Sequence, residues 1–418
     1  MFFIDLVFFP LAFVMIVYLI RHYVFTGIVL IYGRGVRRFS NGGGCFKPFV
    51  SVVVPARNEE KVVGRLLERI CEFSYLKDKL QVIVVDDGST DRTGKIVDEF
   101  AQRYGFIRVL HRKFAVGKAA ALNEALQYVC GEFVYFFDAD YVPDVDFVER
   151  MNCAFSDLRV GAVQGYIDVL NLGKRVSNVV FLERLGGYRV DQLARDILGL
   201  IPQFGGTSGG VRRCLLESFG GFDENVLAED TDLTFRVCLA GYRVRYLLDV
   251  GSSEEAVDGW RGYWRQKRRW AKGHMQCAFK YFLPVLRSKS LSFGEKLDGL
   301  LLLLIYFVPV LIGLGWVLGA LCFFFGHGFG GGKTAFVLTV VYFVSGNVAP
   351  LSEVIVGAVL ERHWRFCKFL PLLFVAFVLN VFICTCALIE VLFWRLCGKS
   401  PLKWDKTDHE GKICFSRR

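Results

Sequence analysis

Long apolar stretches lie at both ends of the chain and enclose a polar stretch. About 20 apolar residues are enough for a helix to cross a bilayer. Four stretches reach or approach this length, at about 2–20, 296–325, 334–360 and 369–394. We therefore expect part of the molecule to lie in lipid, and the polar stretch to fold as a separate domain.

The pattern divides the 418 residues into four parts. We expect a transmembrane helix and a linker over 1–40, followed by a soluble domain over 41–281. About three transmembrane helices are expected over 282–395, and a basic tail over 396–418. The glycines at 42–44 favour a flexible connection between the first helix and the domain.

The first apolar stretch is either a signal peptide or a retained helix. It has no basic residues before it and no small-residue cleavage site after it, so we expect a retained helix. Basic residues follow it, namely Arg21, His22, Arg34, Arg37 and Arg38. Because such residues are enriched on the cytoplasmic side, we expect a multi-pass protein of the plasma membrane with its soluble domain in the cytosol.

The number of crossings affects where the tail lies. If three helices cross after the soluble domain, the tail lies on the opposite side of the membrane. One stretch is therefore a candidate for a re-entrant or interfacial segment, and 334–360 is the best choice. Its apolar character is interrupted by Gly346, Asn347, Pro350 and Glu353.

The formal net charge of +10 suits nucleic acid, acidic lipid headgroups or phosphate-bearing substrates. Charge alone does not choose among these partners. The basic residues gather beside the apolar stretches, which favours the lipid bilayer as a partner. We expect no nucleic acid to bind.

The polar stretch alternates short apolar runs with amphipathic ones. The runs at 50–54, 81–85 and 133–137 are rich in β-branched and aromatic residues and predict buried strands. The stretches 60–72 and 92–104 have helical spacing with mixed charge. This order is typical of an α/β domain with a mixed, mainly parallel sheet and flanking helices.

Polar clusters follow each of the three predicted strands, where ligands bind in open α/β sheets. Pro55, Arg57 and Glu59 follow the first strand, and Asp86-Asp87 the second. An Asp-Asp-Gly-Ser sequence also suits an ordinary turn or a helix N-cap, so the second cluster is weak evidence by itself.

The third strand is followed by Asp138-Ala139-Asp140. Two neighbouring carboxylates repel one another, and a bound divalent cation offsets that repulsion. Mg²⁺ and Mn²⁺ prefer hard oxygen ligands and can bridge them to a diphosphate. We therefore expect a Mg²⁺ or Mn²⁺ site here; an exposed pair in a solvated loop is the alternative.

Two later motifs have both a chemical and a structural interpretation. Glu229 and Asp230 precede a helical run, where acids stabilise a helix N-terminus. Asp230 could equally take the proton from a sugar hydroxyl that attacks as a nucleophile. The sequence from Gln266 to Trp270 joins an amide, guanidinium groups and an indole, which suits phosphate and sugar binding or an amphipathic helix at the membrane interface.

Taken in order, these motifs resemble the processive family-2 glycosyltransferases, the group of cellulose, chitin, hyaluronan and poly-N-acetylglucosamine synthases. The resemblance covers about 50–280. Its elements are Val54-Pro55-Ala56-Arg57-Asn58-Glu59, Asp86-Asp87-Gly88-Ser89, Gly117-Lys118-Ala119 with Leu122-Asn123, Asp138-Ala139-Asp140, Gln164-Gly165, Phe204-Gly205-Gly206-Thr207, Glu229-Asp230 and Gln266-x-x-Arg269-Trp270.

The resemblance implies a GT-A fold and a role for each matched residue. Asp230 would be the catalytic base, and Asp140 with Asp138 would coordinate the metal. The nucleotide would contact Pro55, Arg57, Glu59, Asp86, Asp87, Lys118 and Asp138, with Asp86 or Asp87 holding the base. The diphosphate or acceptor would contact Glu229, Gln266, Arg269, Trp270, Phe204, Gly205 and Thr207.

Two details of the resemblance bear on the tail and on the base. Ala228 stands where the family usually has Thr, a change outside the carboxylates. Residues 403–407 look like a short element near the end of related synthases. That likeness suggests a cytosolic tail, against the count of crossings.

The resemblance further implies an inverting hexosyltransferase that moves a sugar from a nucleotide-diphosphate sugar, with UDP favoured over GDP, to a growing polysaccharide. Export of the polymer through the membrane helices would follow, although few spans are available for it. The alternative is non-processive transfer of one sugar to a membrane lipid, as in ceramide glucosyltransferases. A receptor or transporter that only binds nucleotide sugar needs no base at Asp230.

Overall fold

The computed structural model describes residues 2–33, 46–324, 348–397 and 409–411. These residues include an eight-stranded sheet with the strand order β3-β2-β1-β4-β7-β6-β8-β5. The strands are β1 (Val50–Ala56), β2 (Leu80–Asp86), β3 (Ile107–His111), β4 (Phe133–Phe136), β5 (Val142–Pro143), β6 (Val160–Val169), β7 (Gly209–Arg212) and β8 (Arg243–Glu254).

The sheet is mixed. Strands β1 to β4 are parallel to one another, β7 runs antiparallel between β4 and β6, and β8 is parallel to β6. The three predicted strands are confirmed as β1, β2 and β4. The expectation of an α/β domain with a mainly parallel sheet is therefore confirmed.

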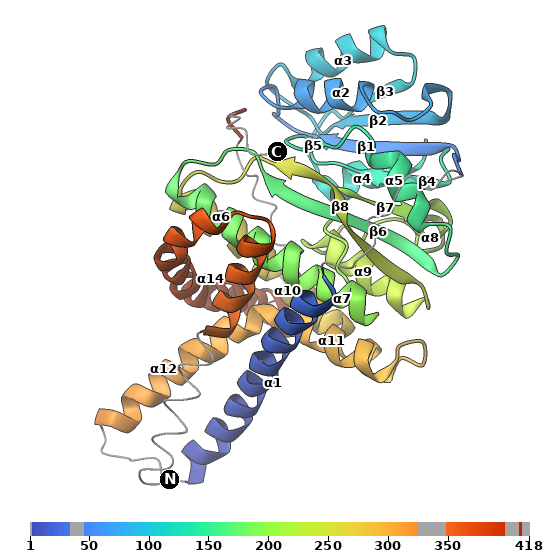
Figure 1. Cartoon of the computed structure of the whole chain (residues 1–418). Helices are drawn as coiled ribbons and strands as arrows, with labels where there is room; N and C mark the ends of the chain where they lie inside the picture. Colours follow the sequence, from blue (N-terminus) through green and yellow to red (C-terminus); the bar gives the residue numbers. More distant parts are fainter. Residues whose placement is uncertain (1, 34–45, 325–347, 398–408, 412–418) are drawn as a thin grey trace.

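Helices cover both faces of this sheet (Figure 1). The two helices predicted near its start are confirmed as α2 and α3. The helices of the domain are α2 (Val63–Cys71), η1 (Lys77–Lys79), α3 (Thr93–Arg103), α4 (Lys118–Leu126), α5 (Phe147–Ala154), α6 (Arg175–Arg184), the π-helix η2 (Leu185–Gln192), α7 (Leu193–Leu198), α8 (Arg213–Ser218), α9 (Glu229–Leu239) and α10 (Trp260–Arg287).

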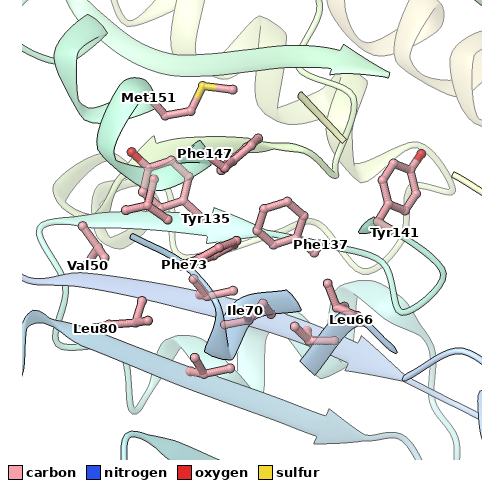
Figure 2. Packing of buried hydrophobic residues seen from close by; sticks show 14 of the residues in the cluster. Val50, Leu66, Ile70, Phe73, Leu80, Tyr135, Phe137, Tyr141, Phe147 and Met151 are labelled. Carbon is pink, nitrogen blue, oxygen red and sulfur yellow. The ribbon is translucent and has the colours of Figure 1, made fainter. Parts of the chain in front are cut away.

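Alternate residues of the strands enter different cores. Val52 faces a cluster that contains Leu66 of α2 and Phe147 of α5 (Figure 2). Val53 faces a cluster that contains Leu122 of α4 and Leu233 of α9. Because both faces are covered, β1, β2 and β4 are largely apolar, and this composition makes them recognisable in the sequence.

Three apolar helices are candidates for membrane spans among the described residues: Ala12–Tyr32, Phe293–Leu318 and Trp364–Cys397. They comprise the second part of α1 (Phe2–Tyr32), α11 (Phe293–Leu304) with η3 (Ile305–Phe307) and part of α12 (Val308–Phe324), and η4 (Trp364–Phe369) with α14 (Leu370–Cys397). In Figure 1, α1 and α12 extend together away from the sheet.

The first helix is longer than we expected. It continues past Ile20 to Tyr32, so Arg21 lies inside it and not in its flank. Arg21 forms an ion pair with Asp191 of η2, and its Nε lies 3.8 Å from an oxygen of Asp298 in α11. A basic residue is tolerated inside the helix because acids compensate its charge. The placement of Arg21 in a basic flank was therefore wrong.

The expected stretch 334–360 is described only from residue 348 onward, as a shorter apolar helix, Val348–Leu360. Its Glu353 forms a 2.7 Å ion pair with His22, and Ala358 joins a core cluster with Leu185 of η2. A Cβ atom at Gly357 would lie 2.8 Å from the Leu185 carbonyl oxygen, so this close approach requires glycine. The described part of the stretch thus packs against the soluble domain.

Helix α10 joins the soluble domain to the apolar helices. It runs through residue 281, where we expected the domain to end. Ala271 and Met275 of α10 pack against Cys384 and Ala387 of α14. Residues in the middle of α10 are therefore fixed between the sheet domain and an apolar helix.

Candidate active site

A cavity lies at the carboxyl ends of β1 and β4 and extends to α9, α10 and η3. Because β1 and β4 are parallel, with Val53 opposite Phe136, the residues that follow both strands meet at one edge. Most of the predicted site residues line this cavity. They are Pro55, Arg57, Glu59, Asp87, Lys118, Asp138, Asp140, Gly205, Thr207, Glu229, Asp230, Gln266, Arg269 and Trp270.

Two predicted site residues do not line the cavity. Phe204 is fully buried in the core, with its ring centroid 6.2 Å from that of Phe136. Asp86 accepts a 3.0 Å hydrogen bond from the Ser89 backbone N–H and lies 3.0 Å from Nδ1 of His111. Asp86 thus shapes the turn after β2 and leaves Asp87 as the acid at the cavity wall.

Asp87 holds the segment that leads into α4. Its carboxylate accepts hydrogen bonds from the backbone N–H groups of Val116 at 3.2 Å and Gly117 at 3.0 Å, and from Arg112 at 2.9 Å. Gly117 has φ of +134°, which favours glycine. The acid therefore fixes the position of Lys118, the first residue of α4.

Lys118 connects three parts of the site. Its Nζ lies 2.8 Å from Asp138 and 3.1 Å from Glu229, and it donates a 3.4 Å hydrogen bond to the carbonyl of Gly206. Burial lowers the pKa of Lys118, but the two acids outweigh burial and hold it above its usual range. Lys118 is therefore a permanent cation that draws the end of β4 towards the start of α9.

Asp138 and Asp140 follow β4, and both line the cavity. The backbone N–H of Asp138 donates to Oγ1 of Thr207 at 3.0 Å, which fixes this turn. The pKa of Asp140 is raised to about 7, mainly by burial, with His409 lowering it and the charge of Asp138 adding to the rise. A buried carboxylate that lacks compensation is stabilised by a divalent ion. The donor set therefore fits Mg²⁺ or Mn²⁺.

His409 also belongs to this corner. Its Nδ1 lies 3.2 Å from an oxygen of Asp140, and the neighbouring N–H groups of Glu410 and Gly411 donate to Glu255 at 2.9 Å. Three His, Cys, Asp or Glu side chains close enough to hold a metal by themselves do not occur in the described ranges. A cation at Asp138 and Asp140 would therefore complete its shell with water or a diphosphate.

Asp230 lies in the first turn of α9. Its Oδ1 accepts hydrogen bonds from the Thr231 backbone N–H at 2.6 Å and from Oγ1 of the same residue at 3.3 Å. Within the described part of the chain no hydrogen bond engages Oδ2. Gly206, with φ of +71°, approaches so closely that a Cβ atom there would lie 3.0 Å from the Asp230 Cβ. The second oxygen is thus available for a proton.

Burial raises the pKa of Asp230 to about 6, and Glu229 contributes to this rise, while Lys118 and Thr231 oppose it. A carboxyl with this pKa is ionised near neutral pH and is a stronger base than an exposed one. Ala228, where the resemblance led us to expect Thr, contacts Gly273 of α10, and a Cβ at that glycine would lie 2.7 Å from the Ala228 Cβ. The structure therefore leaves little room for a larger residue here.

Helix α10 contributes Gln266, Arg269 and Trp270 to the cavity wall. The indole of Trp270 is in contact with two cations: Lys267 lies 5.0 Å and Arg184 5.4 Å from the ring centroid. Cation–π contacts of this kind hold the ring in one orientation.

Several cavity residues were not predicted from the sequence. They are Tyr141, Arg184, Tyr188, Glu254, His274, Tyr306 and His409. His409 follows the tail element at 403–407 by two residues, so that element could have indicated it. Arg184, Tyr188 and Tyr306 belong to apolar or mixed helical stretches, in which spacing does not separate a site residue from a packed one.

Comparison with known proteins agrees with the resemblance of the soluble domain to family-2 glycosyltransferases. Residues 51–215 match the glycosyl transferase family 2 model. The chain is 35% identical over 247 residues to the "Probable glycosyltransferase YdaM" of Bacillus subtilis, a match that covers 58% of this chain and 59% of YdaM. It is 33% identical over 244 residues to a beta-monoglucosyldiacylglycerol synthase of Nostoc sp., covering 58% of this chain and 52% of that protein.

The chain thus matches little more than half the length of these relatives. Among solved structures, the mannosyltransferase PcManGT from Pyrobaculum calidifontis, in complex with GDP-Man and Mn²⁺, has a TM-score of 0.61 and 24% sequence identity, covering 92% of this chain and 99% of that one. This likeness concerns the fold, which is GT-A-like. Residues 51–215 are therefore similar to the glycosyl transferase family 2 domain.

Proposed function

We propose that the protein is an inverting glycosyltransferase that moves one sugar from a nucleotide-diphosphate sugar to a lipid acceptor in the membrane. One observation carries the proposal. A single cavity is lined by Asp138 and Asp140, by Asp230, and by Tyr306, which belongs to the candidate span Phe293–Leu318. The residues proposed to bind the cation, the proposed base and a candidate membrane helix therefore line the same cavity.

Transfer of one sugar to a membrane lipid was the second of the two interpretations that the sequence allowed. The resemblance put a growing polysaccharide first, but the name of the Nostoc relative describes synthesis of a glycolipid. An acceptor held in a bilayer can reach a cavity whose wall includes a membrane helix. Polymer formation is the competing outcome of the experiment below.

Different residues of the cavity are proposed to bind the nucleotide and the metal. Arg57, Asp87 and Lys118 lie on the nucleotide side, where the segments after β1 and β2 meet. Asp138 and Asp140, with His409 beside them, would hold Mg²⁺ or Mn²⁺. When bound, such an ion neutralises part of the charge of the diphosphate.

Asp230 acts as the base. Oδ1 is held by Thr231, so the carboxylate is oriented before substrate binds. As the acceptor oxygen attacks the anomeric carbon, its proton passes to Oδ2. The bond from that carbon to the diphosphate breaks on the opposite face, and the configuration inverts without a covalent enzyme intermediate.

We propose a multi-pass protein of the plasma membrane with a cytosolic domain, supported by three candidate spans. UDP is the proposed nucleotide on the basis of the resemblance.

The test uses the purified full-length protein in lipid nanodiscs that contain diacylglycerol. It is incubated with a panel of UDP- and GDP-sugars and Mg²⁺ or Mn²⁺, and products are analysed by mass spectrometry. We expect one donor to give lipid carrying a single sugar with the inverted anomeric configuration. A ladder of polymer would overturn the lipid proposal, and release of nucleotide without any glycoside would overturn transfer itself.

A further inference from the structure

Arg184 is a charged cavity residue to which the sequence assigned no role. It is the last residue of α6 and directly precedes the π-helix η2. Its side chain is only 17% exposed, and that exposed part lines the cavity. Short π-helical segments occur often at functional sites, so the location of Arg184 favours a role in ligand binding.

The guanidinium is held by one edge. Its Nε donates a 2.6 Å hydrogen bond to Oε1 of Glu254, while the hydroxyl of Tyr141 donates to Oε2 of the same carboxylate at 2.6 Å. Because Tyr141 occupies the second oxygen, Glu254 does not engage the outer edge of the arginine. No hydrogen bond joins either Nη atom of Arg184 to the described residues, and both atoms remain accessible to solvent.

The outer edge of the guanidinium lies between Asp140, which is proposed to bind the cation, and Trp270, which is proposed to contact the diphosphate or the acceptor. Tyr141 directly follows Asp140 in the chain. On the other side, the guanidinium lies 5.4 Å from the ring centroid of Trp270 and 5.6 Å from that of Tyr188. Glu254 and the two rings thus hold the side chain in place before any ligand binds, which reduces the entropy lost on binding.

A diphosphate in this cavity needs cationic N–H donors that are not already hydrogen-bonded. The cavity wall is rich in acids: Glu59, Asp87, Asp138, Asp140, Glu229, Asp230 and Glu254. Lys118 is committed to Asp138 and Glu229. Arg57 lies at the nucleotide edge after β1. Arg184 offers two Nη groups beside Trp270, in the planar arrangement that matches phosphate oxygens.

We propose that Arg184 binds the diphosphate of the donor and stabilises it as the leaving group. The inference rests on the proposed function and names a residue for it. In the reaction, the bond from the anomeric carbon to the diphosphate oxygen breaks and its electron pair stays on that oxygen. The Nη groups donate hydrogen bonds to the resulting charge, while the proton of the acceptor goes to Asp230.

The experiment measures nucleotide binding, so it does not require the sugar or the acceptor to be known. Full-length protein in detergent is titrated with UDP, UMP, GDP and GMP at a fixed Mg²⁺ concentration. The wild type should bind one diphosphate more tightly than its monophosphate. Arg184→Gln should weaken binding of the diphosphate by about 10- to 100-fold and leave the monophosphate unchanged.

The matched control is Arg175→Gln, which makes the same change at an exposed position at the start of the same helix. It should bind all four nucleotides like the wild type. A second variant, Arg184→Gln with Glu254→Gln, removes the carboxylate that the single change leaves without its arginine. If Arg184 binds the diphosphate, the double variant keeps the selective loss and unfolds at the temperature of the wild type.

Two results would overturn the inference while leaving the proposed function intact. In one, the double variant regains the preference for the diphosphate, which would mean that the stranded Glu254 caused the loss. In the other, Arg184→Gln binds the diphosphate and the monophosphate with the affinities of the wild type. A wild-type protein that binds neither UDP nor GDP would instead overturn the proposed function, and the inference with it.

Discussion

At the scale of single residues, the site depends on carboxylates whose surroundings differ. Asp87 is engaged by backbone N–H groups and Arg112, and Asp138 by Lys118, so both have structural partners. Asp140 and Asp230 are less compensated, and burial raises the pKa of each. Acids with different surroundings can take different roles in one site. We therefore propose cation binding for Asp140 and proton transfer for Asp230.

Replacing the base should separate binding from turnover. Asp230→Asn keeps the size of the side chain and removes its basicity, so we expect kcat of transfer to fall about 100- to 10,000-fold. Nucleotide affinity, measured by calorimetry, should stay within about twofold, because the carboxylate acts on the acceptor. Asp157→Asn, at a loop position before β6, serves as the control and should retain full activity. Turnover at the wild-type rate would exclude Asp230 as the base.

The pKa of Asp230 also predicts a pH dependence. The base must be ionised, and its pKa is raised to about 6. The active form therefore predominates above pH 6 and is lost as the pH falls through that value, by about tenfold per unit. We expect kcat at saturating substrates to follow this acidic limb. A profile that stays flat down to pH 4.5 would contradict the raised pKa.

At the scale of elements, a buried ion cluster joins α1, η2 and α11. Arg21 and Arg195 share the acids Asp191 and Asp298, with Nε of Arg195 2.9 Å from Asp298. The side chain of Arg195 is only 2% exposed. Such clusters contribute specificity of packing more than net stability, because each charge must first lose its water. Here the cluster fixes how the first apolar helix meets the soluble domain.

Removing one arginine from this ion cluster should destabilise the protein. Arg21→Met leaves two buried acids with one arginine, and loss of one partner from such a cluster costs about 3 to 5 kcal/mol. We expect the thermal unfolding midpoint in detergent to fall clearly. Arg261→Met, at an exposed position in the first turn of α10, should leave it unchanged. The double variant Arg21→Met with Asp191→Asn should lose less than the sum of the two single changes, because the residues interact directly.

At the scale of the whole molecule, one cavity collects side chains from parts of the chain that are far apart in sequence. Arg57 follows the first strand, Tyr306 lies in an apolar helix, and His409 comes from the described part of the tail. The contact between His409 and Asp140 places this piece of the tail beside the soluble domain. This agrees with a tail on the same side as the domain, as the likeness of residues 403–407 suggested.

The tail contact predicts an altered metal requirement. His409→Ala removes a side chain next to Asp140, and we expect the Mn²⁺ concentration for half-maximal activity to rise about tenfold. Chelation should abolish activity in the wild type, and added Mn²⁺ should restore it. His363→Ala, at a histidine that packs on Phe181 outside the cavity, is the control. An unchanged Mn²⁺ dependence would show that His409 has no part in the cation site.

The sequence by itself determined the α/β class, three strands of the sheet and about half of the residues that line the cavity. These follow from local rules: a strand covered on both faces is apolar throughout, and polar residues at its end line the ligand edge. The acids at 138, 140 and 230 were predicted because a few residue types in a fixed order mark them. The candidate spans were likewise visible as long apolar stretches, because lipid imposes a composition.

Only the tertiary structure decided which of these residues work together. It moved Phe204 into the core and Asp86 into a turn, and it brought Arg184, Tyr306 and His409 to the cavity. It also placed Arg21 inside a helix, because acids on η2 and α11 compensate the charge. The Arg21 contacts join residues at least 170 positions apart, for which a single sequence carries no periodic signal. Local patterns therefore specify the elements, while packing selects the partners of each charge.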